Sequence, residues 1–376
     1  MSLIEHNSQS AAFPVQATNA ATLPSAATWV SPRTKSEAAS PAHRTPRAPR
    51  PPAAARANAW RGSFLHSIYL RHAATRQVRI AFECQGSAAA PVLLVAGGIS
   101  AHRHVAASAS FVEPGWWQEQ VGPDAALDTN RYRVIAIDWL GADGSLDIPI
   151  DVCDQADAFA ALLDHLQIQR VAAFIGCSYG AMVGLQFAAR HRTRLGCLLA
   201  ISGGDRPHPF SSAWRALQRR IARLGRSDAA CREALSLARQ LAMLSYRTPE
   251  EFAARFATPA VLVDGDVRCA AEDYLDACGA SYVVKTPLTA FLRLSESIDL
   301  HAVEPESVAV PTVLVAIEED RLVPKSTLIA LAERLPALRR MHVLRSGYGH
   351  DAFLKETPAI AAIIRDTLRE AAGALA

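Results

Sequence analysis

Short, wholly apolar runs alternate with segments of helical periodicity from about residue 60 to the end of the chain. Such a run is typical of a strand buried on both faces of a parallel sheet, and apolar residues three or four positions apart indicate a helix. The pattern predicts strands over residues 78–83, 91–96, 132–137, 171–175, 195–201, 310–317 and 341–344, and helices over residues 151–166, 182–190 and 358–372. This alternation predicts an α/β fold, with a mostly parallel central sheet and helices on both faces.

Two stretches interrupt the alternation. Between residues 207 and 304 the strands stop and Arg- and Leu-rich helical sequence takes over, so we expect a helical cap inserted into a core domain of residues 61–206 and 305–376. Residues 1–60 are rich in Ala, Pro, Ser and Arg, with Glu5 and Glu37 as their acidic residues. They bury too little apolar surface to offset the entropy of ordering, so we expect a disordered tail or a start codon placed upstream of the native one; a transit peptide is the alternative.

Composition and charge mainly exclude functions. The 376 residues carry a net charge of +3 with acids and bases nearly balanced, which gives no general argument for nucleic-acid or membrane partners, and no apolar run reaches membrane-spanning length. The seven cysteines are dispersed, without a C-x-x-C pair or a nearby histidine at zinc spacing, so we expect reduced thiols in the cytoplasm and no metal site. No phosphate-cradling glycine motif lies at a strand-to-helix turn, so no resident nucleotide cofactor is expected.

The central chemical feature is Gly176-Cys177-Ser178-Tyr179-Gly180, which lies directly between a predicted strand and a predicted helix. It fits the G-x-S-x-G pattern of a nucleophile elbow, a tight turn that exposes a serine above a parallel sheet. Glycine on either side lets the backbone pass without a Cβ clash. This context favours Ser178 as the nucleophile of an α/β-hydrolase fold over an ordinary strand-to-helix turn.

A serine hydroxyl is a poor nucleophile without a base, and in this fold the acid and the histidine follow the serine in that order. Asp320 lies just past the predicted strand 310–317 and is the expected acid, with Glu319 as the fallback. His350 lies in a glycine-flanked loop after the last predicted strand and is the expected base.

The oxyanion of an acyl-transfer intermediate needs two backbone donors. One is expected to be the N–H of Tyr179, the residue after the nucleophile. The other is expected from the loop after the predicted strand 91–96, where Gly98 or Ile99 would serve.

A longer match lies ahead of the predicted strand 132–137. It comprises Gly115-Trp116-Trp117-Gln118, Val121-Gly122-Pro123 and Ala126-Leu127-Asp128-Thr129-Asn130-Arg131-Tyr132. This stretch resembles the GWW…GPG.AIDT.RY sequence of the homoserine O-acyltransferases, and the resemblance covers about residue 80 to the C-terminus. It implies a ping-pong reaction of methionine biosynthesis, in which Ser178 takes an acetyl or succinyl group from acyl-CoA and passes it to the hydroxyl of L-homoserine. Acyl-CoA is then a substrate, not a bound cofactor, and the family implies a homodimer joined through the caps.

The resemblance also implies which residues bind the zwitterionic amino acid. Tyr246 matches the family's cap tyrosine, and Asp351 matches the acid after the catalytic histidine. A carboxylate side chain can bind the ammonium group and an arginine can bind the carboxylate, each through charge-assisted hydrogen bonds. For the arginine, the candidates Arg219, Arg232 and Arg239 stay open.

The chain departs from the family pattern at the mouth of the expected site. At the elbow, the chain has Gly176-Cys177-Ser178-Tyr179-Gly180-Ala181 where the family has G-N-S-M-G-G. After the predicted strand 132–137, residues 138–145 replace the family's N-x-L-G-S-C-x-G-S. These changes leave the triad intact but alter the mouth of the site, where the donor and the acceptor would bind. Acetyl or succinyl donors and homoserine or serine acceptors therefore all stay open. An esterase or other hydrolase on the same scaffold is the alternative in a different class.

Overall fold

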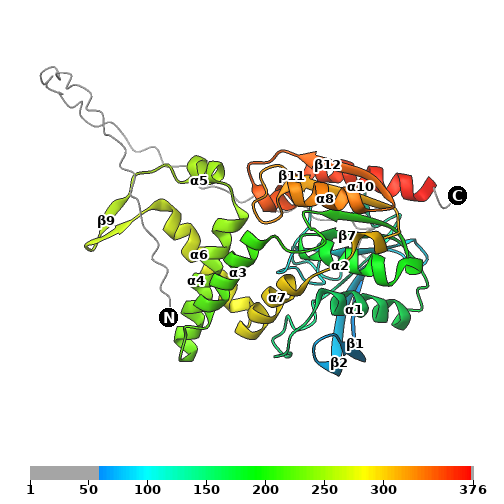
Figure 1. The fold of residues 1–376 in the computed structure, drawn as a ribbon, viewed down its shortest axis with the longest axis horizontal. Coiled ribbons are helices and arrows are strands. Elements are labelled where there is room, and N and C mark those ends of the chain that lie inside the picture. The colour runs from blue at the N-terminus through cyan, green and yellow to red at the C-terminus, as the bar shows by residue number, and fades with distance from the viewer. Residues whose placement is uncertain (1–58, 374–376) are drawn as a thin grey trace, which may run out of the picture. The chain divides into compact units, whose positions relative to one another are not determined.

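A central sheet of eight strands organises the computed structural model, which describes residues 59–373 (Figure 1). The tail predicted for residues 1–60 lies outside this range except for its last two residues. The strands, in sheet order, are β1 (Ala59–Leu70), β2 (Ala74–Gln85), β6 (Arg133–Ile137), β3 (Val92–Ala96), β7 (Val171–Cys177), β8 (Leu195–Ile201), β11 (Thr312–Ile317) and β12 (Leu338–Leu344). The β1–β2 and β2–β6 pairs are antiparallel and all other neighbours are parallel. The predicted α/β class with a mostly parallel sheet is confirmed.

Adjacent residues of the central strands point into two separate apolar layers. Leu94 and Phe174 pack with the helices α1 (Val152–His165) and α2 (Tyr179–Arg190) on one face. Leu93 and Ile175 pack with Trp117 and with α10 (Thr357–Gly373) on the other. The period of two in a strand explains why these sequences are continuously apolar when both faces are covered.

The remaining core helices are short or lie near the sheet edge. They are α8 (Lys325–Arg334), α9 (Ala352–Lys355) and the 3₁₀ turns η2 (Arg192–Arg194), η3 (Pro305–Ser307) and η4 (Gly349–Asp351). Within the described range, no helix is both long and apolar enough to cross a membrane.

Five helices occupy the stretch predicted to be a cap, between β8 and β11. They are α3 (Pro209–Ala222), α4 (Asp228–Tyr246), α5 (Pro249–Arg255), α6 (Ala270–Lys285) and α7 (Leu288–Leu300). The expectation that strands stop there is wrong, because β9 (Val261–Val263) and β10 (Asp266–Arg268) form a hairpin. Its turn residues Asp264 and Gly265 have φ of 54° and 94°. An Asp-Gly pair between apolar residues favours such a turn, and the surrounding helical periodicity obscured it.

The strand β1 was also not predicted. It is an edge strand whose residues are largely exposed, including Trp60, Leu65 and Tyr69, so it lacks the apolar alternation of a half-buried strand. The short parallel pair β4 (Val121–Gly122) and β5 (Leu127–Asp128) was missed because two residues carry no periodicity.

Candidate active site

Ser178 lies in the sharp turn that joins β7 to α2. Its φ of 55° and ψ of −115° lie outside the regions that non-glycine residues usually adopt, so the surrounding structure must hold it there. The Ser178 N–H donates to the Ile201 carbonyl of β8, and the Gly180 N–H donates to the Gly97 carbonyl after β3, each at 2.8 Å. These bonds tie the turn to both neighbouring strands and present the hydroxyl at their carboxyl ends.

The two glycines of the elbow are required by close backbone contacts. A Cβ atom on Gly176 would collide with the carbonyl of Gly180, and one on Gly180 would collide with the carbonyl of Ala96. Backbone atoms cannot move aside as a flexible side chain can, so the G-x-S-x-G pattern has a steric cause in this turn.

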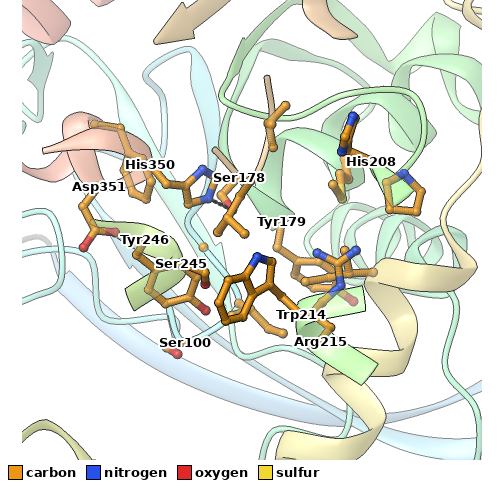
Figure 2. Close-up of a pocket in the computed structure, with 18 of the residues that line it drawn as sticks. Ser100, Ser178, Tyr179, His208, Trp214, Arg215, Ser245, Tyr246, His350 and Asp351 are labelled. Atoms are coloured by element: carbon orange, nitrogen blue, oxygen red, sulfur yellow. Dashed lines mark hydrogen bonds between the residues drawn. The ribbon is translucent and has the colours of Figure 1, made fainter. Parts of the chain in front are cut away.

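His350 connects Ser178 to Asp320 through hydrogen bonds. Its Nε2 lies 2.7 Å from the Ser178 Oγ, and its Nδ1 lies 2.7 Å from Oδ2 of Asp320 (Figure 2). The other carboxylate oxygen accepts the N–H groups of Leu322 at 2.8 Å and Val323 at 3.0 Å, which fixes the carboxylate. The three predicted residues come from separate loops and lie in the order nucleophile, base and orienting acid.

Glu319, the fallback acid, points elsewhere. Its Oε2 accepts the Ser346 N–H at 2.7 Å, and its Oε1 lies 3.6 Å from Nε of Arg345. Glu319 therefore braces the loop before His350, and Asp320 is the carboxylate that contacts the histidine ring.

The charge of Asp320 tunes His350 as a base. Burial alone would lower the pKa of His350, but the negative charge of Asp320 and the hydrogen bond to it outweigh burial and raise the pKa above the ordinary 6.5. The raised pKa strengthens the ring as a proton acceptor for Ser178.

The predicted oxyanion donors surround the serine. Tyr179 is the first residue of α2, so its N–H has no acceptor within the helix. Gly98 and Ile99 line the same cavity as Ser178, and a Cβ on Gly98 would lie 3.9 Å from the Cβ of Ser178. Their positions suit the predicted role, which stays a prediction.

A cavity of about 220 Å³ opens in front of Ser178 (Figure 2). The cap supplies one wall and the core supplies the other. Cap residues in the wall are Trp214, Arg215 and Gln218 of α3 and Arg239, Ser245 and Tyr246 of α4, and core residues include Trp116, Met182, Leu322, Val323 and Phe353. The cavity is therefore completed by the cap.

Three of the predicted amino-acid-binding residues line this cavity. The ring of Tyr246 stacks on that of His350 with centroids 6.0 Å apart, and the guanidinium of Arg239 lies 5.4 Å from the Tyr246 ring centroid. Asp351 follows His350 and faces the same space (Figure 2). This side of the cavity offers a carboxylate for an ammonium group and a guanidinium for a carboxylate.

Arg219 is a wrong prediction for this site, because it does not line the cavity. Its Nη1 donates to Oδ2 of Asp299 at 2.7 Å and to Oγ of Ser295 at 3.0 Å. Arg232 is exposed on the outside of α4. The residue pattern of α3 and α4 gave their helical periods but not their rotation against the core, so it could not separate these arginines from Arg239.

Arg247 was given no role from the sequence, although it follows Tyr246 directly. Its Nη2 lies 3.2 Å from Oδ2 of Asp351, and its Nη1 donates to Oε1 of Glu251 at 3.1 Å. Burial raises the pKa of the Asp351 carboxyl, and the positive charge of Arg247 opposes that rise. Arg247 thus positions Asp351 at the cavity wall.

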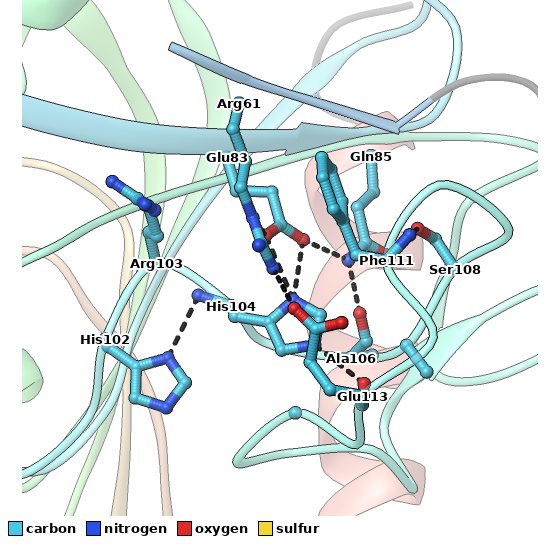
Figure 3. A network of polar contacts seen from close by, with 12 residues as sticks. Arg61, Glu83, Gln85, His102, Arg103, His104, Ala106, Ser108, Phe111 and Glu113 are labelled. Atoms are coloured by element: carbon cyan, nitrogen blue, oxygen red, sulfur yellow. Dashed lines mark hydrogen bonds and ion pairs between the residues drawn. The ribbon is translucent and has the colours of Figure 1, made fainter. Parts of the chain in front are cut away.

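A buried polar network lies behind the loop of residues 98–117, which carries part of the cavity wall (Figure 3). Glu83 on β2 accepts from Nε of Arg61 at 2.7 Å and from Nε2 of Gln85 at 2.8 Å. Both of its carboxylate oxygens also lie 3.0 Å from Nδ1 of His104. The network fastens the loop to the first two strands of the sheet.

His104 is the member of the network that belongs to the loop. Its Nε2 lies 2.8 Å from the carbonyl of Glu113, so both ring nitrogens face acceptors and both can donate only in the imidazolium form. Burial opposes the charge, but the hydrogen bond with Glu83 prevails and raises the pKa of His104. Burial likewise opposes the charge of Glu83, but the hydrogen bonds from His104 and Gln85 prevail and lower its pKa.

A larger cavity of about 1220 Å³ adjoins the first. The two share Ile99, Ser100, Ala101 and Arg239 in their walls. Basic residues outnumber acidic ones in the larger cavity, with Arg79, Arg103, Arg239, Arg247 and Lys285 against Asp138 and Asp143. Its wall therefore suits a long, anionic molecule that reaches toward Ser178.

Comparison with known proteins gives consistent matches. A family model of the α/β hydrolase fold matches residues 91–357. A homoserine O-succinyltransferase from Xanthomonas campestris pv. campestris is 58% identical over 309 residues, which cover 82% of this chain and 84% of the relative. A homoserine O-acetyltransferase from Nocardia farcinica is 30% identical over 324 residues, covering 74% of this chain and 83% of the relative. The crystal structure of homoserine O-acetyltransferase from Bacillus anthracis matches with a TM-score of 0.75 over 83% of this chain and 98% of that chain, at 17% identity, which supports the fold alone.

Proposed function

Because this chain belongs to the homoserine O-acyltransferase family of α/β-hydrolase-fold enzymes, we propose that it transfers a succinyl group from succinyl-CoA to the hydroxyl of L-homoserine. The observation that carries this choice of donor is the 58% identity to a homoserine O-succinyltransferase. The chain is an acyltransferase, and the reaction is a step of methionine biosynthesis.

In the first half of the proposed reaction, Ser178 becomes acylated. His350 accepts the proton of the Ser178 hydroxyl while Oγ attacks the thioester carbonyl of succinyl-CoA. The N–H of Tyr179 and an N–H of the Gly98–Ile99 loop stabilise the oxyanion. The C–S bond then breaks, His350 gives its proton to the departing CoA thiolate, and a succinyl ester remains on Ser178.

In the second half, homoserine accepts the acyl group. Asp351 binds its ammonium group, Arg239 binds its carboxylate, and Tyr246 closes the side of the cavity over His350. His350 now takes the proton of the homoserine hydroxyl, whose oxygen attacks the ester carbonyl. Collapse of the intermediate returns the proton to Ser178 and releases O-succinylhomoserine.

Release of free thiol from CoA tests this function directly. We expect succinyl-CoA with homoserine to release thiol at least about tenfold faster than acetyl-CoA with homoserine, or than succinyl-CoA with serine or with no amino acid. The measurement is a colorimetric thiol assay on the purified full chain, with the product identified by mass spectrometry.

Each alternative gives a different result in this assay. A preference for acetyl-CoA would contradict the proposed donor, and a preference for serine would contradict the proposed acceptor. Release that ignores the amino acid would identify a hydrolase on the same scaffold and contradict the transferase.

The larger cavity is where we place the CoA part of the donor. It meets the catalytic cavity at Ser100 and Arg239, so a pantetheine arm in the shared passage would bring the thioester to Ser178. The phosphates of CoA would then lie among Arg79, Arg103 and Lys285 of its wall. Lys285 at the end of α6 is an exposed cation of that wall.

Replacing Lys285 with Ala is expected to raise the KM for acyl-CoA about two- to fivefold with little change in kcat, since an exposed charge contributes at most about 1 kcal/mol. Steady-state kinetics at low and moderate salt would measure it, and salt should weaken the effect. The control is Lys325→Ala, because Lys325 pairs with Glu318 and lines neither cavity. Equal KM values for the two variants would contradict CoA binding at this wall.

Two further expectations rest on smaller observations. All seven cysteines are unpaired, which supports a reducing compartment such as the cytoplasm. Apolar residues of the β9–β10 hairpin are exposed, namely Val261, Leu262, Val263 and Val267, which supports a homodimer joined through the caps.

A further inference from the structure

Three arginines line the catalytic cavity, and they differ in what holds them. Arg239 lies beside Tyr246, on the side proposed for the amino acid. Arg206 has 53% of its side chain exposed and donates to the adjacent Asp205 at 2.9 Å. Arg215 on α3 is 12% exposed and pairs with Asp299 of α7, a neighbouring cap helix.

Arg215 is held from one side and open on the other. Its Nε and Nη2 donate to Oδ1 of Asp299 at 2.9 and 2.6 Å, and Nη2 also donates to Oγ of Ser212 at 3.1 Å. Within residues 59–373, its Nη1 makes no hydrogen bond to protein. The guanidinium is thus fixed in orientation while one edge keeps its donors for a ligand.

Among residues 59–373, the direct ion pairs of Arg215 do not balance its charge. Asp299 is shared between Arg215 and Arg219, which donates to its other oxygen at 2.7 Å. Two largely buried guanidiniums therefore meet one carboxylate, which leaves an excess of one positive charge. An uncompensated charge away from water is costly unless a counter-ion approaches it, so the arrangement favours an anionic ligand at Arg215.

Arg215 lies on the side of the cavity away from Asp351 and Tyr246 (Figure 2). Its positive charge also acts on His350, where it opposes the rise in the pKa of the ring. Apolar side chains of Met182, Ile298 and Leu322 line the same cavity and suit a methylene chain. This side of the cavity therefore combines an apolar surface with the positive charge of Arg215.

We propose that Arg215 forms the subsite for the distal carboxylate of the acyl group, and so selects succinyl-CoA over acyl donors without that charge. This inference rests on the proposed acyltransferase function and assigns the residue behind its donor preference. A succinyl chain extends about 4 Å beyond the ester carbonyl carbon, so its carboxylate needs a partner in the cavity that holds Ser178 rather than in the larger one. Arg239 then serves the carboxylate of the amino acid, and the two carboxylates bind on opposite sides of Ser178.

Acyl-CoA selectivity tests the subsite. The ratio of kcat/KM for succinyl-CoA to that for butyryl-CoA, which has the same chain without the charge, is measured on wild type and on Arg215→Met. Wild type is expected to prefer succinyl-CoA, and Arg215→Met is expected to lower this ratio about 30- to 100-fold, the size of a charge-assisted, partly buried contact.

Arg219→Met is the matched control. It also removes one of the two guanidiniums from Asp299 but lines no part of the cavity, so its ratio should stay within about threefold of wild type. If Arg215→Met does not fold, Arg215→Gln, which keeps a donor for Asp299, carries the same expectation.

The outcomes separate this inference from the proposed function. Wild type that prefers succinyl-CoA while the Arg215 variant keeps that preference overturns the subsite alone. If wild type has equal kcat/KM values for acetyl-CoA, butyryl-CoA and succinyl-CoA, both the proposed donor and the subsite are overturned. An equal loss of selectivity in the Arg219 variant would assign the effect to Asp299 rather than to Arg215.

Discussion

Replacing Asp320 with Asn is expected to lower kcat/KM about 1,000- to 10,000-fold while the chain remains folded. The carboxylate accepts from Nδ1 of His350 and thereby leaves Nε2 as the acceptor for the Ser178 hydroxyl. An amide at this position can present an N–H to Nδ1, which favours the tautomer with its proton on Nε2 and removes the base. It also removes the charge that raises the pKa of His350. Steady-state acyl transfer, with the melting temperature as the check on folding, measures the effect.

Glu319→Gln is the control for this substitution. Glu319 is the neighbouring acid on the same loop, but it accepts from the Ser346 N–H and does not contact His350. We expect less than about a fivefold change in kcat/KM, because a neutral amide oxygen can still accept that bond. If Glu319→Gln lost activity and Asp320→Asn kept it, the assignment of the acid would be reversed.

The triad could be predicted from the sequence because it depends on order along the chain. A serine after one buried strand, an acid after a later strand and a histidine after the last strand must meet at one edge of a parallel sheet. Ser178, Asp320 and His350 could therefore be identified from the sequence without knowing how any helix is rotated. The buried strands were equally readable, because each is apolar on both faces.

The cap was less predictable because function there depends on the rotation of helices. Arg215 and Arg219 lie four residues apart on one face of α3, and both reach Asp299. Only the packing of α3 against the cap helices α4 and α7 decides that Arg215 lines the cavity and Arg219 does not. The role of Arg247 was hidden for a similar reason, since its contact with Asp351 joins residues about 100 positions apart.

The buried network around Glu83 is a feature that no local pattern indicated. Glu83 lies in β2 between apolar neighbours, has 1% of its side chain exposed, and contacts His104 from a different segment. Replacing Glu83 with Gln is expected to lower the free energy of unfolding by about 2–4 kcal/mol, because Arg61 and His104 lose the carboxylate that compensates their buried donors. Urea unfolding monitored by circular dichroism measures this change.

Glu113→Gln is the matched variant, since Glu113 also pairs with Arg61, at 2.7 Å, but has 52% of its side chain exposed. Solvent screens that pair, so its loss should cost less than about 1 kcal/mol. Similar losses for the two substitutions would show that burial of Glu83 adds nothing to its contribution.

The pH dependence of this difference follows from the directions of the two pKa shifts. The raised pKa of His104 means that its contribution is complete below the ordinary 6.5 and is lost as the pH rises through the raised value. The lowered pKa of Glu83 means that its contribution is complete above the ordinary 4.5 and is lost as the pH falls through the lowered value. The stability gap between wild type and Glu83→Gln should therefore be larger near pH 5.5 than at an alkaline pH above the raised pKa of His104. A gap that is the same at both pH values would mean that the pair with Arg61 alone, and not the pair with His104, accounts for the stabilisation.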